Sequence, residues 1–306
     1  MSSIVAPDIT PTRKYEWRTI LRHRWPLRLM HWINLLCMLA MVGSGLQILN
    51  AHPALYWGEA SHFDTPLLAT RTVVRGDELR GETRIGSARF DTTGVLGVSA
   101  DANGKPTSAV VPGWAMIPGW RDLATGRRWH FFFAWAWVIN GLCYLAWSLA
   151  SRHLKRDLAM RRVDWRSIPR SILDHLRFHH PVGDEAARYN PLQKLAYLAV
   201  IFVLTPLIVV TGLSMSPQMD TGMGWFLALI GGRQSARTLH FLAMASFVLF
   251  AVVHVVMVVY AGPINEMRSM ITGRFRVHYP RVGASVSEPA PPLPAEGVPE
   301  RENPHE

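Results

Sequence analysis

Residues 238–261 read TLHFLAMASFVLFAVVHVVMVVYA, a run of 24 residues that contains no Asp, Glu, Lys or Arg. As an α-helix the run would be about 36 Å long, enough to cross the hydrocarbon core of a bilayer, which is about 30 Å thick. Core helices of soluble proteins seldom continue that far without a charge. The segment therefore predicts a membrane-spanning helix, and it carries two histidines, His240 and His254.

Three further apolar blocks extend this prediction to the whole chain. The four blocks cover roughly residues 26–49, 129–150, 192–215 and 236–261, and each is long enough to span the bilayer once. Hydrophobic residues make up 49% of the chain, and they are concentrated in these blocks. We expect an all-α membrane protein built as a bundle of four transmembrane helices.

The charged residues between the blocks predict how the helices are oriented. The chain carries 32 Lys and Arg against 22 Asp and Glu, and the excess lies in a leader, residues 1–23, and in the link 151–191. Because the excess flanks the apolar blocks, we interpret it as a topology signal and expect no nucleic-acid partner. The positive-inside rule then places the leader, the link and the tail, residues 263–306, in the cytoplasm. The Pro- and Glu-rich end of the tail is expected to be disordered.

The loop 51–126 faces the opposite side and is far longer than an ordinary connection of about 4–6 residues. It carries seven basic and eight acidic residues. Within it, residues 83–111 show short alternating runs and the pair Asn103-Gly104, which is typical of a tight hairpin turn. We therefore expect the outer loop to form a cap over the helix ends that contains a small β-hairpin.

Four histidines lie in the predicted spans, where an ionisable side chain is costly and usually functional. His31 lies in the first span, His130 near the start of the second, and His240 and His254 in the fourth. The last two are 14 residues apart. On an α-helix that spacing turns the second side chain to within roughly 40° of the first after about four turns, and separates the two by about 21 Å along the helix axis. They therefore share one helix face at two depths, too far apart for one metal ion and suited to two.

The predicted orientation of the spans pairs these histidines by depth. His130 and His240 belong near the outer face, and His31 and His254 nearer the cytoplasmic face. Two imidazoles on one iron leave no open position, which suits electron transfer. We interpret the two pairs as ligands of two b-type haems, one above the other across the bilayer. For each histidine taken alone, a hydrogen bond between helices is the alternative.

Small residues in the spans would leave room for a flat macrocycle. Gly45 lies 14 residues after His31, so it shares a helix face with His31 at the depth of the outer pair. Gly141 and Gly212 are similar candidates in the second and third spans. Close helix packing is the alternative explanation for each glycine.

Four motifs within residues 20–275 carry a family resemblance. They are RLMHW at 28–32, GRRWHFFFAW at 126–135, YNPLQKLAY at 189–197 and TLHFLAMASFVLFAVVH at 238–254. Together they resemble the superfamily of bacterial cytochromes b561 and nickel-iron hydrogenase b-type cytochromes, which includes formate dehydrogenase gamma subunits and thiosulfate reductase cytochrome b. The resemblance implies a bacterial inner-membrane protein whose four histidines are axial haem ligands.

The resemblance also implies a quinone pocket near the cytoplasmic haem. The YNPLQK segment matches the part of formate dehydrogenase gamma subunits that supplies a polar quinone contact. Asn190 is the matching position, with Gln193 and Lys194 as weaker candidates. Because Asn190 precedes Pro191, a role as the N-cap of the third span is the alternative.

Arginines beside two of the histidines are candidates to pair with haem propionates. Arg28 precedes His31 by three residues, and Arg127 and Arg128 precede His130 by three and two residues. The alternative is that these arginines are ordinary positive flanks of membrane helices.

The long outer loop departs from the short turn of minimal family members, and a partner protein on the outer face is one reason for it. Residues 113–135 resemble family members that pair with molybdopterin oxidoreductases of the sulfite-oxidase type, and an iron-sulfur protein is an equal alternative. We expect residues 24–262 to form a di-haem cytochrome b domain that transfers electrons between a periplasmic oxidoreductase and the membrane quinone pool. One alternative is a stand-alone cytochrome b561 that oxidises superoxide or reduces ferric ions. Another is a transporter or assembly factor for haem or metal.

Overall fold

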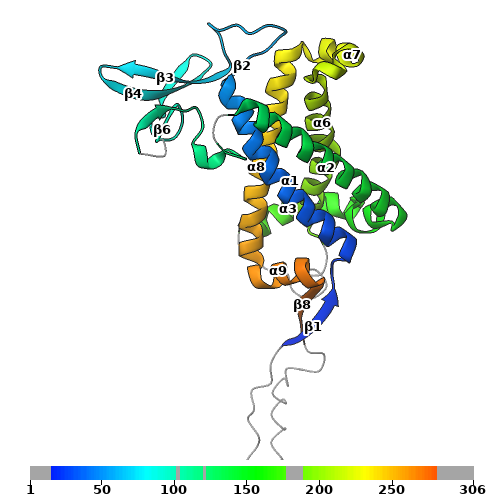
Figure 1. Cartoon of the computed structure of the whole chain (residues 1–306). Helices are drawn as coiled ribbons and strands as arrows, with labels where there is room; N and C mark the ends of the chain where they lie inside the picture. Colours follow the sequence, from blue (N-terminus) through cyan, green and yellow to red (C-terminus); the bar gives the residue numbers. More distant parts are fainter. Residues whose placement is uncertain (1–14, 101–103, 120–121, 177–188, 281–306) are drawn as a thin grey trace, which may run out of the picture.

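The computed structural model describes residues 15–100, 104–119, 122–176 and 189–280. Four helices in it are long and apolar enough to cross a membrane (Figure 1). They are α1 (Trp25–Ala51), α2 (Leu123–Ala150), the third span Pro191–Ser214 and α8 (Arg233–Ala261). These helices match the four predicted spans. The start of the predicted leader, the end of the tail and residues 177–188 of the cytoplasmic link lie outside the described residues.

The third span is built from three consecutive helical pieces. They are α5 (Pro191–Ala199), the π-helical turn η3 (Val200–Leu204) and α6 (Thr205–Ser214). Pro206 has no backbone N–H, so it cannot donate the usual helical hydrogen bond to the preceding turn. The wider turn lies directly before it, and the Thr205 hydroxyl donates to the Val200 carbonyl at 2.8 Å.

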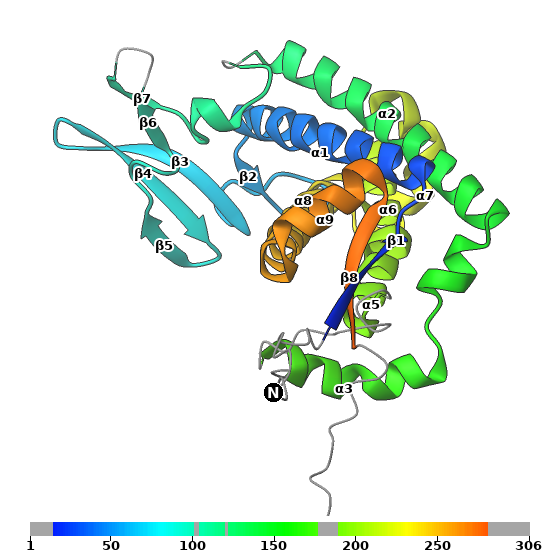
Figure 2. The same ribbon diagram turned by 90° about the horizontal axis from the view of Figure 1, so that it is seen from below.

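The bundle consists of two helix pairs. The closest packing between spans joins α1 with α2 and α6 with α8. Figure 2 shows the spans from the end that carries β1 and β8, with a β-sheet set off to one side. His31 and His130 lie on the first helix pair, whereas His240 and His254 lie on the second. Any contact between the predicted histidine partners therefore bridges the two helix pairs.

The outer loop holds more β-structure than its sequence predicted. A four-stranded antiparallel sheet has the order β2-β3-β4-β5, and a separate two-stranded sheet pairs β6 with β7. The tight turns β3–β4 and β4–β5 each contain a glycine at positive φ, Gly76 at 64° and Gly86 at 57°. The strands are β2 (Ala54–Leu55), β3 (Leu68–Arg75), β4 (Glu78–Ile85), β5 (Ala88–Asp91), β6 (Val98–Ala100) and β7 (Pro106–Ser108).

The strands β6 and β7 lie on either side of the predicted Asn103-Gly104 turn and pair antiparallel. Asn103 itself is outside the described residues, so the type of this turn stays a prediction. The small sheet approaches β4 closely at two glycines. A Cβ on Gly81 would lie 1.9 Å from the Leu96 carbonyl oxygen, and one on Gly97 would lie 2.5 Å from the Gly81 Cα. Only glycine fits at this crossing.

Hydrogen bonds fix the outer region to the bundle. The Thr238 hydroxyl of α8 donates to the Tyr56 carbonyl at 2.6 Å, and the Gly58 amide donates to the Ser235 hydroxyl at 2.9 Å. The Gln47 side chain of α1 donates to the Asp122 carbonyl at 2.9 Å. The outer region is thus attached to the ends of α1, α2 and α8, the three helices that carry the histidines.

The two ends of the described chain pair with each other. The strands β1 (Tyr15–Leu21) and β8 (Arg274–Pro280) form an antiparallel ribbon, which follows the helix α9 (Pro263–Thr272). Arg22 forms an ion pair with Glu266 at 3.1 Å beneath the ribbon. The sequence had assigned no structure to these parts of the leader and tail. Their pairing places both ends on one side of the bundle, as an even number of spans requires.

The remaining helices lie in the connections. They are the 3₁₀ turn η1 (Gly113–Ala115), the π-helical turn η2 (Leu154–Leu158), α3 (Arg162–Leu176), the 3₁₀ turn η4 (Pro217–Met219) and α7 (Asp220–Ile230). With eight strands among the described residues, the protein is mostly helical and not all-α.

Candidate functional site

The structure brings the four histidines together in the two pairs predicted from the sequence. His130 of α2 and His240 of α8 have ring centroids 6.2 Å apart at an interplanar angle of 63°. His31 of α1 and His254 of α8 have centroids 6.3 Å apart at 58°. Both pairs bridge the two helix pairs of the bundle.

These separations fit two imidazoles that bind one metal ion from opposite sides. A metal–nitrogen bond of about 2.0–2.1 Å, with the ring centroid about 1.1 Å beyond the nitrogen, places the two centroids about 6.3 Å apart. Within the described residues, no cluster of three or more His, Cys, Asp or Glu could hold a bare metal ion. Each pair therefore fits two axial ligands of an iron whose other ligands come from a macrocycle.

Hydroxyl groups hold the outer pair in a defined tautomer. The Nδ1 of His240 lies 3.0 Å from the Ile208 carbonyl oxygen and 3.1 Å from the Thr211 hydroxyl. Because a carbonyl only accepts, Nδ1 carries the hydrogen and Nε2 is left with its lone pair for a metal. His130 has the matching arrangement, with Nδ1 3.1 Å from the hydroxyl of the fully buried Ser44.

Two of the three candidate glycines lie against these imidazoles. A Cβ on Gly45 would lie 3.4 Å from Cε1 of His130, and a Cβ on Gly212 would lie 3.1 Å from Cε1 of His240. Apart from the backbone of its own helix, a Cβ on Gly141 would meet no heavy atom of the described residues within 4 Å. Gly45 and Gly212 therefore leave space beside the histidine rings, whereas Gly141 has no such neighbour.

The inner pair lies among aromatic side chains. Phe250 stacks on His254 with ring centroids 6.0 Å apart, and Trp32 meets His31 edge-on at 5.6 Å. The Nδ1 of His31 is buried and has no hydrogen-bond partner among the described residues. Within the described ranges, His31 thus lacks a hydroxyl partner of the kind that each outer histidine has.

The arginines predicted beside the haems have protein partners in the structure. A guanidinium nitrogen of Arg28 donates to the Ile271 carbonyl at the end of α9. Arg127 lies over the Phe131 ring, 6.0 Å from its centroid. The structure brings neither arginine into contact with a histidine of the two pairs, and any pairing with propionates stays a prediction.

Asn190 and Gln193 form a capping box at the start of α5. The Asn190 side-chain oxygen accepts from the Leu192 amide at 2.9 Å, and the Gln193 side-chain oxygen accepts from the Asn190 amide at 3.2 Å. Lys194 forms an ion pair with Asp164 of α3 at 3.0 Å. The capping role proposed as the alternative for Asn190 is therefore present in the structure.

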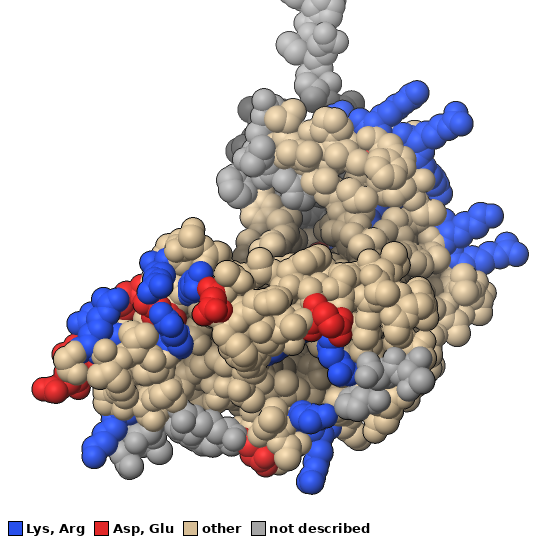
Figure 3. Space-filling model, turned by 90° about the horizontal axis from the view of Figure 1, so that it is seen from above, with Lys and Arg blue, Asp and Glu red and all other residues tan. Residues whose placement is uncertain are grey.

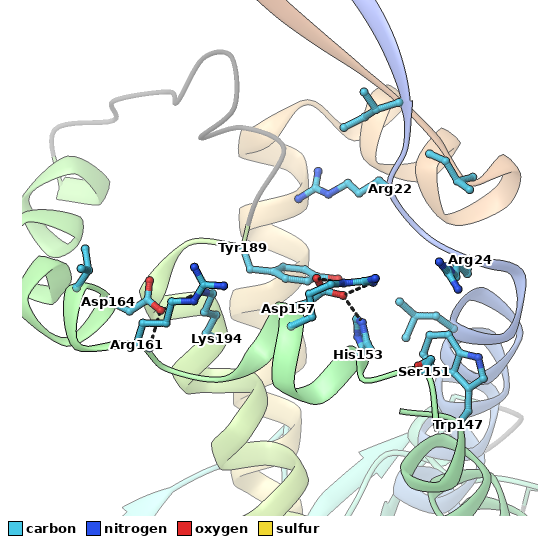
Figure 4. A pocket seen from close by; sticks show the side chains of 15 residues that line it. Arg22, Arg24, Trp147, Ser151, His153, Asp157, Arg161, Asp164, Tyr189 and Lys194 are labelled. Atoms are coloured by element: carbon cyan, nitrogen blue, oxygen red, sulfur yellow. Dashed lines mark hydrogen bonds and ion pairs between the residues drawn. The ribbon is translucent and has the colours of Figure 1, made fainter. Parts of the chain in front are cut away.

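A cavity of 790 Å³ lies beside these residues at the end of the bundle that carries β1 and β8 (Figure 4). Tyr189, Lys194 and Arg22 line it, together with the pair His153 and Asp157. His153 Nδ1 lies 2.7 Å from the Asp157 carboxylate. Burial favours the neutral form of Asp157, but hydrogen bonds from Arg156 and His153 outweigh it and lower the Asp157 pKa. The carboxylate is therefore held ionised against His153.

Ring contacts join this cavity to the inner histidine pair. Tyr189 contacts Tyr197 with centroids 5.7 Å apart, Tyr197 contacts Phe250 at 6.3 Å, and Phe250 stacks on His254. Burial raises the pKa of Tyr189 well above its usual value, so its hydroxyl keeps its proton. The cavity is thus continuous in packing with His254.

The sequence did not single out several residues of this site. His153 and Asp157 have the i, i+4 spacing of a helical pair, which was a usable signal in the cytoplasmic link. His23 is buried, and burial together with the positive charge of Arg22 lowers its pKa to about 4. Ser44 gave no signal apart from being polar in an apolar span.

Four spans, three of which are bridged by two half-buried histidine pairs, are typical of one class of protein, the multi-pass membrane cytochromes with b-type haem. The match to a family model agrees. The chain matches the model of the prokaryotic cytochrome b561 family over residues 22–273, and it belongs to this family. Haem b is accordingly the cofactor that the family implies.

Individual relatives are named as subunits of a reductase and of hydrogenases. Over 148 residues the chain is 32% identical to the "putative protein-methionine-sulfoxide reductase subunit YedZ1" of Azospira oryzae, covering 48% of the chain and 71% of that protein. It is 29% identical over 136 residues to a "probable Ni/Fe-hydrogenase B-type cytochrome subunit" of Cupriavidus necator, covering 41% of the chain and 56% of that relative. A protein of the same name from Azotobacter chroococcum is 27% identical over 175 residues, 53% of the chain and 70% of its own length. No solved structure gives a significant match.

Proposed function

We propose that the chain is a di-haem electron-transfer subunit that connects an oxidoreductase on the outer face of the membrane with the quinone pool. The observation that carries the proposal is the pair of histidine contacts, with centroids 6.2 and 6.3 Å apart, at two depths of α8. Residues 24–262 form the di-haem domain in this proposal. When bound, the two haems supply one-electron transfer between the two depths of the bilayer.

The protein side chains hold the ligands in place. His130 and His240 offer Nε2 because their Nδ1 atoms face the hydroxyls of Ser44 and Thr211. His31 and His254 offer the inner ligand set. With both axial positions taken by histidine, neither site leaves an open position for a substrate.

The distribution of charge supports an orientation with both termini in the cytoplasm of a bacterial inner membrane. The segments at the end with β1 and β8 are rich in arginine, as the positive-inside rule expects for the cytoplasmic side. The opposite face carries interspersed positive and negative side chains over the β-sheet and is mostly uncharged over the helix ends (Figure 3). The histidine pair of His31 and His254 is then the cytoplasmic one.

The cavity beside this inner pair is our candidate quinone site. A quinone carbonyl needs a hydrogen-bond donor, and the cavity offers the Tyr189 hydroxyl and the Lys194 ammonium. The Asp157 carboxylate accepts from Nδ1–H of His153 and fixes its tautomer, which gives the cavity a group that can hold a proton. Asn190 is the N-cap of α5. It thereby fixes the start of the helix between Tyr189, which precedes it, and Lys194, which lies in the first turn.

The outer region is our candidate docking site for the partner. It is hydrogen-bonded to α8 next to the outer histidine pair, through Tyr56 and Gly58. The relatives are named as subunits of a methionine-sulfoxide reductase and of nickel-iron hydrogenases. We propose a molybdopterin oxidoreductase as the partner, with an iron-sulfur protein as the alternative.

The proposal is tested with the full chain purified in mild detergent. We expect two haems b per polypeptide, two components in a potentiometric titration, and reoxidation of the reduced protein by a soluble quinone analogue. A tagged chain isolated from native membranes should retain an outer-face molybdenum or iron-sulfur protein. A purified folded chain without tightly bound haem would overturn the proposal. Rapid reduction of the oxidised protein by superoxide, or rapid reoxidation of the reduced protein by ferric ions, without any effect of quinone would favour a stand-alone cytochrome.

A further inference from the structure

A second hollow lies on the surface of the bundle where α2, η2 and the third span meet. It is a groove of 620 Å³, separate in its lining from the cavity described above. Its walls include Leu149, Leu198 and Phe202, which belong to the apolar spans. Leu149 is 66% exposed and Phe202 is 49% exposed, so the groove opens toward the surroundings of the bundle.

Two cations line this groove together with its apolar residues. Arg152 and Lys155 both line it, and both side chains are exposed. Neighbouring Arg156 is paired with Asp157 at 2.9 Å. Within the part of the chain that the structure describes, neither Arg152 nor Lys155 forms an ion pair. Their charges are therefore available to an anion from outside the chain.

The backbone at Arg152 points to the same conclusion. Arg152 follows the C-cap of α2 with a φ of 56°, the one positive φ of a residue other than glycine among the described residues. Its amide donates to the Leu149 carbonyl at 3.1 Å and closes the end of the helix. Glycine adopts this conformation without strain and is the usual residue there. An arginine at this position carries a backbone cost, which its side chain can offset by binding an anion.

We propose that this groove binds one anionic phospholipid of the leaflet at the arginine-rich end of the bundle. The lipid phosphate lies between the Arg152 guanidinium and the Lys155 ammonium, and an acyl chain follows the apolar wall from Leu149 to Phe202. Charge complementarity and the apolar wall together select this occupant. An inorganic phosphate would leave the wall uncovered, and the headgroup of a zwitterionic lipid would bring a further positive charge beside Arg152 and Lys155.

The test compares lipid binding to the purified full chain and two double variants by native mass spectrometry during titration with phosphatidylglycerol. Arg152→Gly with Lys155→Gln removes both cations and keeps the backbone conformation at the end of α2. Arg162→Gln with Arg166→Gln removes two exposed cations of α3 at the same end and is the matched control. Parallel titrations use phosphatidylcholine and inorganic phosphate.

We expect one tightly bound phosphatidylglycerol in the wild type and in the α3 control. Each surface cation contributes about fivefold to the attraction of an anionic lipid, so the groove variant should bind about 30-fold more weakly. Its melting temperature without lipid should not fall below that of the wild type, because glycine relieves the strain at residue 152. Equal binding by the groove variant, an equal loss in the α3 control, or equal affinity for phosphatidylcholine or phosphate would each overturn the proposal.

Discussion

Ser44 Oγ donates a hydrogen bond to the Ala40 carbonyl at 2.7 Å and lies 3.1 Å from Nδ1 of His130. Because the hydroxyl hydrogen is already used, the oxygen accepts from Nδ1–H of the imidazole. When Nδ1–H donates a hydrogen bond, the lone pair on Nε2 becomes a stronger electron donor to a metal ion. The serine of α1 thereby tunes the ligand of α2 in the proposed outer site.

We predict that Ser44→Ala raises the midpoint potential of the outer haem, because weaker donation by His130 stabilises the oxidised iron less. A lost hydrogen bond of about 1 kcal/mol corresponds to roughly 40 mV for one electron. Potentiometric titration followed by absorbance measures both components. The control is Ser246→Ala, whose hydroxyl donates to the Leu242 carbonyl of its own helix at 2.8 Å. An equal shift in the control, or a shift of the inner component instead, would refute the assignment.

Gly212 and Gly141 make a matched pair of helix glycines. An alanine at 212 would place its Cβ 3.1 Å from the His240 ring, which is held by two hydrogen bonds and cannot easily move. Overpacking of this kind costs about 1–3 kcal/mol, so we expect Gly212→Ala to lose much of the outer haem. Gly141→Ala meets no atom and should be neutral or stabilising by up to about 1 kcal/mol. The haem content and the melting temperature of the two variants are compared with those of the wild type. Equal haem content in Gly212→Ala and Gly141→Ala would contradict the proposed ligand role of His240.

Two substitutions at Asn190 separate its capping role from a direct role with quinone. Its side-chain oxygen accepts from the Leu192 amide, and aspartate accepts there equally well. Asn190→Asp should therefore keep the stability and quinone reactivity of the wild type, whereas Asn190→Ala should lose about 1 kcal/mol of stability. Thermal unfolding and quinone reoxidation rates provide the comparison. If Asn190→Asp abolishes quinone reoxidation at unchanged stability, the side chain donates to quinone after all.

The ion pair of Asp164 and Lys194 predicts a pH dependence for the docking of α3. Burial favours the neutral form of Asp164, but hydrogen bonds from the Arg161 amide and Lys194 outweigh it, so the folded-state pKa lies below the usual value of an aspartate. A lowered carboxyl pKa stabilises the folded state above about pH 4, and this contribution is lost as the pH falls through the folded-state pKa.

Hydrogen exchange of the α3 amides measures this contribution directly. Protection should be constant between about pH 7 and 5 after correction for the intrinsic rate, and should fall below about pH 4. Asp164→Asn should lower the protection about tenfold at neutral pH, because Lys194 is left without its partner. Arg166→Gln removes an exposed charge of the same helix and serves as the control. Unchanged protection in Asp164→Asn would show that the ion pair does not hold α3.

The spans and the histidine contacts could be predicted because both depend on local patterns. Apolar length fixes the spans, and the 14 residues between His240 and His254 fix the two depths. The sheet was underestimated, although Gly76-Asp77 and Gly86-Ser87 are recognisable two-residue turns. The β1–β8 ribbon joins segments more than 250 residues apart, so no local pattern predicts it. The cavity likewise depends on where His153 and Tyr189 meet in space.

The number of haems in single histidine variants tests the central proposal most directly. The wild-type chain should bind two haems b, and His254→Ala and His130→Ala should each bind one. The haem that remains in His254→Ala should be the outer one, and this variant should no longer be reoxidised by quinone. Retention of both haems by a folded His254→Ala variant, or a single haem in the wild type, would contradict the account.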